Sequence, residues 1–142
     1  MTKKRFSKEL FDENDQLAKS AAIKHFTKEG FTVQVNPDRY AADLMLFKNG
    51  KFVQFVECEV KRVWKDDEFP YANVQFPKRK EKYVKEDPIT FFMINNKGSR
   101  ALLVKGVDMI CSILKEVPNK YVFKGEEFFQ VSLDKVVFVD LI

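Results

Sequence analysis

Two carboxylates and a lysine on neighbouring apolar segments are the side chains of this chain best suited to chemistry. Asp43 lies within the apolar segment AADLMLF, where strand propensity disfavours an aspartate. Glu59 and Lys61 lie near the end of the next apolar segment, KFVQFVECEVKR, and the pair Asn49-Gly50 between the two segments is typical of a hairpin turn. We expect this hairpin to bring Asp43 and Glu59 within reach of one divalent cation.

Side chains alternate along a strand, so Glu57, Glu59 and Lys61 are expected on one face, together with Val53 and Phe55. The other face would then carry Phe52, Gln54, Val56, Cys58 and Val60. Charges on a half-buried face are costly unless they are paired or bind a metal.

Carboxylates combined with water and substrate phosphate are the ligands that Mg²⁺ prefers, so Asp43 and Glu59 are candidate metal ligands. Lys61 could contact the scissile phosphate or the attacking water in metal-assisted phosphodiester hydrolysis. The alternative is a structural ion pair between Glu59 and Lys61. Glu57 could be a further ligand or could only balance the charge of Lys61.

The periodicity of the sequence predicts the elements that position these residues. It indicates helices at 11–29, 76–86 and 106–116, an irregular loop at 63–73, and strands at 31–35, 41–47, 51–62, 89–94, 100–105, 127–131 and 135–141. We therefore expect one α/β domain spanning residues 1–142, with a mixed central β-sheet flanked by helices.

Asp43 followed by Glu59-Val60-Lys61 resembles the D…(D/E)-x-K signature of the PD-(D/E)XK nuclease superfamily. The resemblance extends from about Asp12 to Ile94, and the order of elements is similar to the restriction-endonuclease-like α-β-β-β-α-β core, here with C-terminal additions. Many members carry proline where this chain has an alanine before the first acid.

The resemblance implies DNA hydrolysis that depends on Mg²⁺, with Mn²⁺ able to substitute. It implies Asp43, Glu59 and the backbone carbonyl of Val60 as metal ligands, and Lys61 as a catalytic residue. Many members also carry an acid on the first helix, for which Asp15 is the candidate, while an exposed acid favoured by the helix dipole is the alternative. Gln75 is a further candidate supporting residue.

A basic segment follows the motif. Residues 76–85 contain five basic residues and one acidic residue, an excess of +4 that equals the net charge of the whole chain. We expect it to contact the backbone of DNA, or to be only a solvated helix face. Trp64 could stack on bases or pack under its own loop. The candidate nucleic-acid-binding residues are Arg62, Trp64, Lys78, Arg79 and Lys82.

Composition excludes several other kinds of chemistry. A single histidine and two cysteines, Cys58 and Cys111, are too few for the usual zinc sites and histidine triads, and both cysteines are expected to be buried free thiols. No apolar run reaches the ~18 residues that a membrane span needs, and the N-terminal residues lack the apolar stretch of a signal peptide. A cytoplasmic protein without membrane contact is expected.

The preferred hypothesis is a magnesium-dependent endonuclease that acts on DNA, with structure-selective or low sequence specificity. The alternative is a non-catalytic module that binds nucleic acid or takes part in an assembly on the same fold, and a third hypothesis is an enzyme unrelated to nucleic acids. The apolar stretch 136–142 could form a homodimer interface or an edge strand that completes the sheet.

Overall fold

The computed structural model describes residues 8–38, 40–86, 88–119 and 122–141. In chain order its elements are α1 (Lys8–Lys28), β1 (Thr32–Val35), β2 (Leu44–Lys48), β3 (Lys51–Lys61), β4 (Asn73–Pro77), the 3₁₀ helix η1 (Lys78–Glu86), β5 (Ile89–Asn95), β6 (Arg100–Lys105), α2 (Gly106–Ile110), β7 (Ile113–Asn119), β8 (Val122–Ser132), the 3₁₀ turn η2 (Leu133–Lys135) and β9 (Val137–Asp140).

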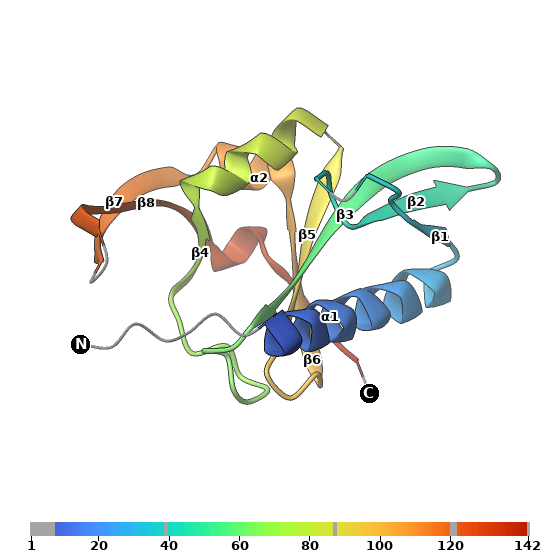
Figure 1. The fold of residues 1–142 in the computed structure, drawn as a ribbon, viewed down its shortest axis with the longest axis horizontal. Helices are drawn as coiled ribbons and strands as arrows, with labels where there is room; N and C mark the ends of the chain where they lie inside the picture. Colours follow the sequence, from blue (N-terminus) through green and yellow to red (C-terminus); the bar gives the residue numbers. More distant parts are fainter. Residues whose placement is uncertain (1–7, 39, 87, 120–121, 142) are drawn as a thin grey trace.

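A six-stranded sheet in the order β1-β2-β3-β5-β6-β9 forms the centre of the fold (Figure 1). Strand β3 pairs antiparallel with β2 and parallel with β5, so the sheet is mixed, as the sequence predicts. Asn49 and Gly50, with φ of 53° and 77°, make the expected β2–β3 turn. The C-terminal stretch forms the edge strand β9, which pairs with β6 and completes the sheet.

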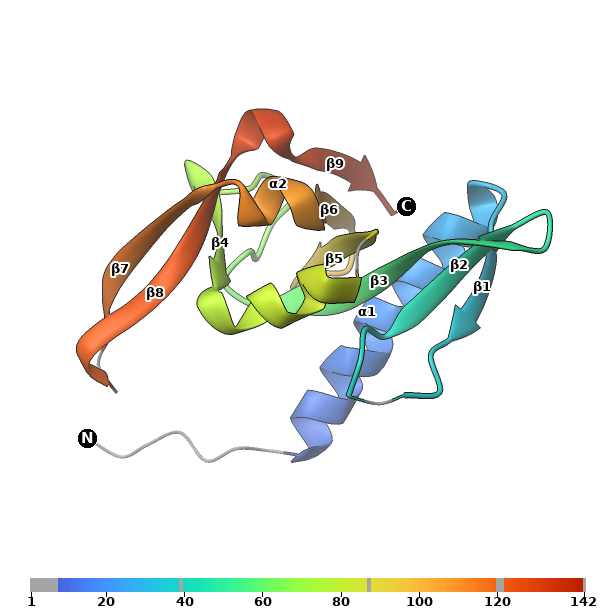
Figure 2. The same ribbon diagram turned by 90° about the horizontal axis from the view of Figure 1, so that it is seen from above.

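Each face of the central sheet buries its own hydrophobic cluster. On one face, α1 packs Ala18, Ala22 and Phe26 against sheet residues that include Val56 and Cys58. The opposite face is covered by a second sheet, β4-β8-β7, together with η1 and α2 (Figure 2). Strand β5 lies between the two clusters, and all seven of its residues are buried.

The predicted helix at 76–86 is wrong in its first residues and in its type. Residues 73–77 form strand β4, because Val74 and Phe76 alternate into the second cluster and pair with β8. The helical turns that follow, in η1, are 3₁₀ and run from 78 to 86.

The predicted helix at 106–116 is too long. Helix α2 ends at Ile110, and the chain continues as β7, which pairs with β8 from Ile113 onward. Pairing with a distant strand overrides the helical pattern here. Cys111 lies between these elements and is exposed, so only Cys58 is the buried thiol that we expected.

None of the helices in the described part of the chain is long and apolar enough to span a membrane.

Candidate functional site

Asp43 lies just before β2, and its carboxylate joins three elements. Its Oδ2 accepts a hydrogen bond of 2.8 Å from the backbone N–H of Cys58 in β3. Its Oδ1 lies 3.6 Å from Nζ of Lys19 in α1. The aspartate that seemed misplaced in an apolar segment therefore holds the start of β2 against β3 and α1.

Glu57 is the acid that the structure places next to Asp43. Its side chain is hydrogen-bonded to Asp43, and its Oε2 lies 3.4 Å from Nζ of Lys80. Only 7% of Glu57 is exposed. Burial, the hydrogen bond with Asp43 and the charge of Asp43 raise the pKa of Glu57 to about 8, against the opposing effects of Lys80 and of a hydrogen bond from Tyr83. With a pKa in this range, Glu57 is mainly protonated near neutral pH, and its O–H donates a hydrogen bond to Asp43.

Glu59 and Lys61 continue the same face of β3, as the alternation predicts. They lie in register with Met93 and Asn95 of β5, just as Glu57 lies in register with Phe91. Burial lowers the pKa of Lys61, while the negative charge of Glu59 acts in the opposite direction. Among the described residues, no ion pair within 4.0 Å joins Glu59 to Lys61.

The expected metal ligands are therefore only partly brought together. Asp43 is hydrogen-bonded to Glu57, whereas within the described part of the chain no hydrogen bond or ion pair joins Asp43 to Glu59. The side chain of Val60 packs toward α1, and its backbone lies in register with Ile94. In the part of the chain that the structure describes, no three His, Cys, Asp or Glu side chains are grouped so that they could hold a metal ion. Asp15 belongs to α1, but its side chain lies outside the described residues.

Three of the candidate nucleic-acid-binding residues belong to η1. Lys78, Arg79 and Lys82 are exposed, with Lys78 3.9 Å from Glu127 and Lys82 4.9 Å from the ring centre of Tyr83. Arg62 is exposed directly after β3. Gln75 is half-buried on β4, opposite Gln130.

Trp64 does not lie where it could stack on bases. It is completely buried, and its ring packs edge-on against Phe69 and Phe138, at 5.4 and 6.0 Å between ring centres. Its indole N–H has no hydrogen-bond partner among the described residues. The interpretation that Trp64 packs under its own loop is the correct one, and it fixes the loop that follows Lys61.

The surroundings of the site also include four residues that sequence reasoning did not single out: Lys19, Lys80, Tyr83 and Asn95. Lys80 and Tyr83 lie three residues apart on η1 and both interact with Glu57, so their helical spacing was the available signal. Asn95 is fully buried beside Lys61. Nothing in the sequence pattern distinguishes it from the other asparagine in its turn.

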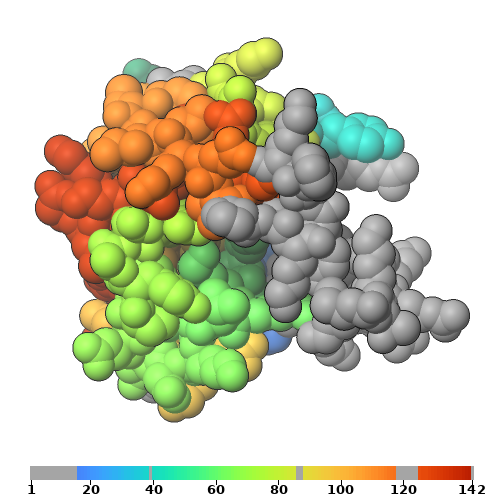
Figure 3. Space-filling view, turned by 90° about the vertical axis from the view of Figure 1, so that its left-hand side faces the viewer, coloured from blue at the N-terminus to red at the C-terminus, as the bar shows by residue number. Residues whose placement is uncertain are grey.

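One side of the molecule is hollowed. In the space-filling view, α2 and β7 (orange) lie above a hollow and the segment 62–77 (green) lies below it, with the darker green of β3 at its floor (Figure 3).

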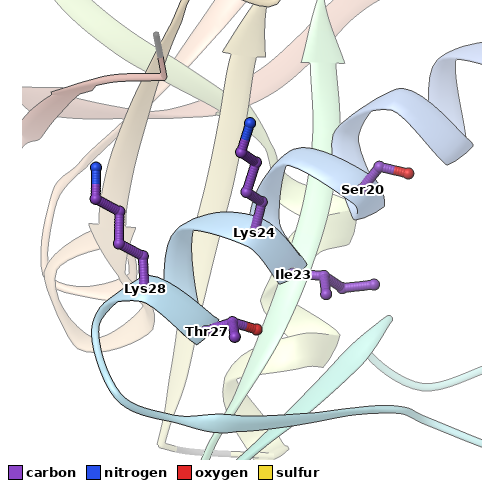
Figure 4. A pocket seen from close by; sticks show the side chains of 5 residues that line it. All are labelled: Ser20, Ile23, Lys24, Thr27 and Lys28. Carbon is purple, nitrogen blue, oxygen red and sulfur yellow. The ribbon is translucent and has the colours of Figure 1, made fainter.

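A second concavity lies on the outer side of α1. It is lined by Ser20, Ile23, Lys24, Thr27 and Lys28, with the two lysines pointing to one side of the helix and Ile23 to another (Figure 4). None of the residues that the sequence predicts for the site lines it, so it is not part of the candidate site.

Comparison with protein-family models, with curated proteins and with solved structures finds no significant match for this chain.

Proposed function

We propose that this protein is a magnesium-dependent nuclease that hydrolyses DNA phosphodiester bonds, an endonuclease of structure-selective or low sequence specificity. The observation that carries the proposal is the hydrogen-bonded pair of acids Asp43 and Glu57, with Glu59 and Lys61 following Glu57 on the same face of β3. The order of elements through β5, with a parallel β3–β5 pair after a crossover, supports a restriction-endonuclease-like core of the PD-(D/E)XK type.

Carboxylate and carbonyl oxygens are the ligands that suit Mg²⁺ or Mn²⁺. A divalent cation would reduce the repulsion between the adjacent carboxyl groups of Asp43 and Glu57. Asp43, Glu59 and the Val60 carbonyl would hold the ion, with Glu57 as the neighbouring carboxylate. A bound ion would polarise the phosphate and lower the pKa of a water molecule.

Lys61 is suited to act on the attacking water or on the phosphate. Burial lowers the pKa of Lys61, which makes its amine easier to deprotonate than that of an exposed lysine. In its charged form it would stabilise the negative charge that builds on the phosphate. The exposed cations Lys78, Arg79 and Lys82 would hold the DNA backbone.

A cleavage assay with matched variants tests the proposal. Wild type, Asp43→Ala, Lys61→Ala and the exposed-lysine control Lys105→Ala would be incubated with supercoiled, linear, single-stranded and branched DNA in Mg²⁺, Mn²⁺ or EDTA. We expect cleavage only with metal, a loss of about 10²–10⁴-fold in Lys61→Ala, and an unchanged rate in Lys105→Ala. Cleavage by Lys61→Ala at the wild-type rate would refute the assignment.

One observation favours the non-catalytic alternative. Lys19 and Lys80 already pair with Asp43 and Glu57, so the carboxyl groups are balanced by cations of the chain itself. In that case the cluster would only stabilise the fold of a DNA-binding module. Binding of DNA without cleavage under any metal would select this alternative.

A further inference from the structure

Helix η1 turns one of its cations toward the candidate site. The side chain of Lys80 is 14% exposed, against 52% for Lys78. The other basic residues of the helix are exposed as well, namely Arg79, Lys82 and Lys85. Lys80 and Tyr83 are three residues apart, which is one turn of a 3₁₀ helix, and both interact with Glu57. Lys80 is therefore the basic residue of η1 that faces the acids on β3.

Two interactions hold the amine of Lys80 at these acids. Its Nζ lies 3.4 Å from Oε2 of Glu57 and 5.4 Å from the ring centre of Tyr83. Glu57 is in turn hydrogen-bonded to Asp43. A cation of the chain itself thus lies beside the pair of acids that the proposed function assigns to a metal site.

The contacts between lysines and acids are long for permanent ion pairs. The distance from Nζ to the carboxylate oxygen is 3.4 Å for Lys80 and Glu57, and 3.6 Å for Lys19 and Asp43. A charge-assisted hydrogen bond between such groups is typically about 2.7–2.9 Å long. Lysine also carries its charge on a flexible four-carbon stem. A cation that binds the carboxyl groups more strongly can therefore displace Lys80 from Glu57.

Lys80 opposes such a cation for as long as it stays in place. A divalent ion held by these acids would meet a like charge on the amine, and the two would repel each other. The ion carries two charges, whereas the proton between Glu57 and Asp43 carries only one. The repulsion from Lys80 therefore acts more strongly on the ion than on the proton that the ion would displace.

We propose that Lys80 is a built-in competitor of the metal ion, which occupies Glu57 in the metal-free protein and must withdraw before the ion binds. Lys80 would thereby set the metal concentration at which the site fills. This role rests on the metal site of the proposed function, but it does not depend on the hydrolysis of DNA. In a non-catalytic module, by contrast, Lys80 would be a permanent partner of Glu57.

Calorimetric titration of the whole chain with Mn²⁺, in the absence of DNA, measures metal affinity separately from cleavage. Lys80→Met and Lys80→Gln remove the charge, and the glutamine keeps a hydrogen-bond donor near Glu57. Lys80→Arg keeps the charge, and the control Lys85→Met removes an exposed charge from the same helix. Because one nearby charge shifts a binding equilibrium by a factor of about ten or more, we expect about tenfold tighter binding in both neutral variants. Lys80→Arg should bind no more tightly than wild type, and Lys85→Met should bind within about twofold of it.

Several results would overturn the proposal. One is equal Mn²⁺ affinity of wild type and a neutral variant that is folded by circular dichroism, which would leave the metal site itself in place. An equal gain in Lys85→Met would show a general effect of net charge. Loss of the folded state in both neutral variants would make Lys80 a permanent structural partner.

The same titration separates this proposal from the proposed function. If none of the proteins binds Mn²⁺, the metal site is refuted, and competition by Lys80 is refuted with it. If the neutral variants bind Mn²⁺ more tightly but no protein cleaves DNA in Mn²⁺, the nuclease proposal is refuted and competition by Lys80 stands.

Discussion

Glu57 is tolerated in the interior because it interacts with the carboxyl group of Asp43, the amine of Lys80 and the phenol of Tyr83. The proton that it keeps near neutral pH makes a hydrogen bond to Asp43, and Lys80 lies on its other side. This arrangement makes the stability of the metal-free protein dependent on pH.

The free energy of unfolding should fall as the pH rises from about 5 to 8. The pKa of Glu57 is raised from 4.5 to about 8 by folding, so over this interval the folded state holds a proton that the unfolded state has lost. We expect a decrease of about 3–4 kcal/mol, measured by urea denaturation in EDTA. Glu57→Gln, which cannot ionise, should show a flatter profile, whereas Glu127→Gln at an exposed position should follow wild type. Identical profiles for Glu57→Gln and wild type would exclude Glu57 as the titrating group.

Single residues were predictable from the sequence only where a local period decides their position. The period of two puts Glu57, Glu59 and Lys61 on one face, and the register with β5 agrees. The partner of Asp43 was not predictable. Glu59 matches the motif, but the actual contact is to Glu57, because the start of β2 lies opposite the middle of β3.

The crossover between β3 and β5 determines what surrounds the site. Parallel strands cannot be joined by a tight turn, so the chain leaves the sheet after Lys61, forms β4 and η1, and returns as β5. Two anchors hold the beginning of this crossover. Trp64 is buried beneath it, and the backbone N–H of Asn96 donates to the carbonyl of Trp64 at 2.7 Å.

Asn95 is the second anchor, and its removal should destabilise the fold. Its Nδ2 donates to the Asp66 carbonyl at 3.2 Å, and its Oδ1 accepts from the backbone N–H groups of Ser99 and Arg100 at 2.9 and 3.1 Å. Asn95→Ala removes the partner of these part-buried groups, so we expect a loss of about 2–3 kcal/mol in chemical denaturation. Asn96→Ala, at an exposed position in the same turn, serves as the control. An Asn95→Ala loss no larger than that of the control would show that these hydrogen bonds are not needed.

Secondary-structure elements were predictable where a strand pairs with its neighbour in sequence. The prediction failed where the paired strand is distant in sequence. The hairpins β2–β3 and β5–β6 follow from turn residues and alternation. Strands β4 and β7 were missed because both pair with β8, and in the case of β4 the partner of Asn73 is Ser132. Pairing with a distant strand produces no hydrophobic periodicity that could be recognised within either short segment.

The distribution of charge over the whole molecule is uneven, since residues 76–85 carry an excess of +4 that equals the net charge of the chain. If DNA binds there, cations released from the phosphates should dominate the affinity, and the affinity should fall steeply with salt.

The salt dependence of duplex binding would be measured for wild type, Lys82→Ala and the control Lys97→Ala. Each phosphate contact that is lost lowers the slope of log affinity against log salt by about 1, so we expect this decrease for Lys82→Ala. Lys97 is exposed in the β5–β6 turn near Asp66, and its removal should leave the slope unchanged. An equal slope for wild type and Lys82→Ala would exclude η1 as the DNA-binding surface.

The burial of β5 on both faces has a consequence for amide hydrogen exchange. The strand lies between β3 and β6 and under both hydrophobic clusters, so no local opening can expose its amides without breaking both layers at once. We expect the amides of β5 to exchange only through global unfolding, at the same free energy as that found by denaturation. The edge strand β1, largely exposed and paired on one side only, should exchange through local opening at a much lower free energy. The strand beside Glu59 and Lys61 would then be the last part of the molecule to lose its protection, while the outer strands of the same sheet exchange around an intact centre.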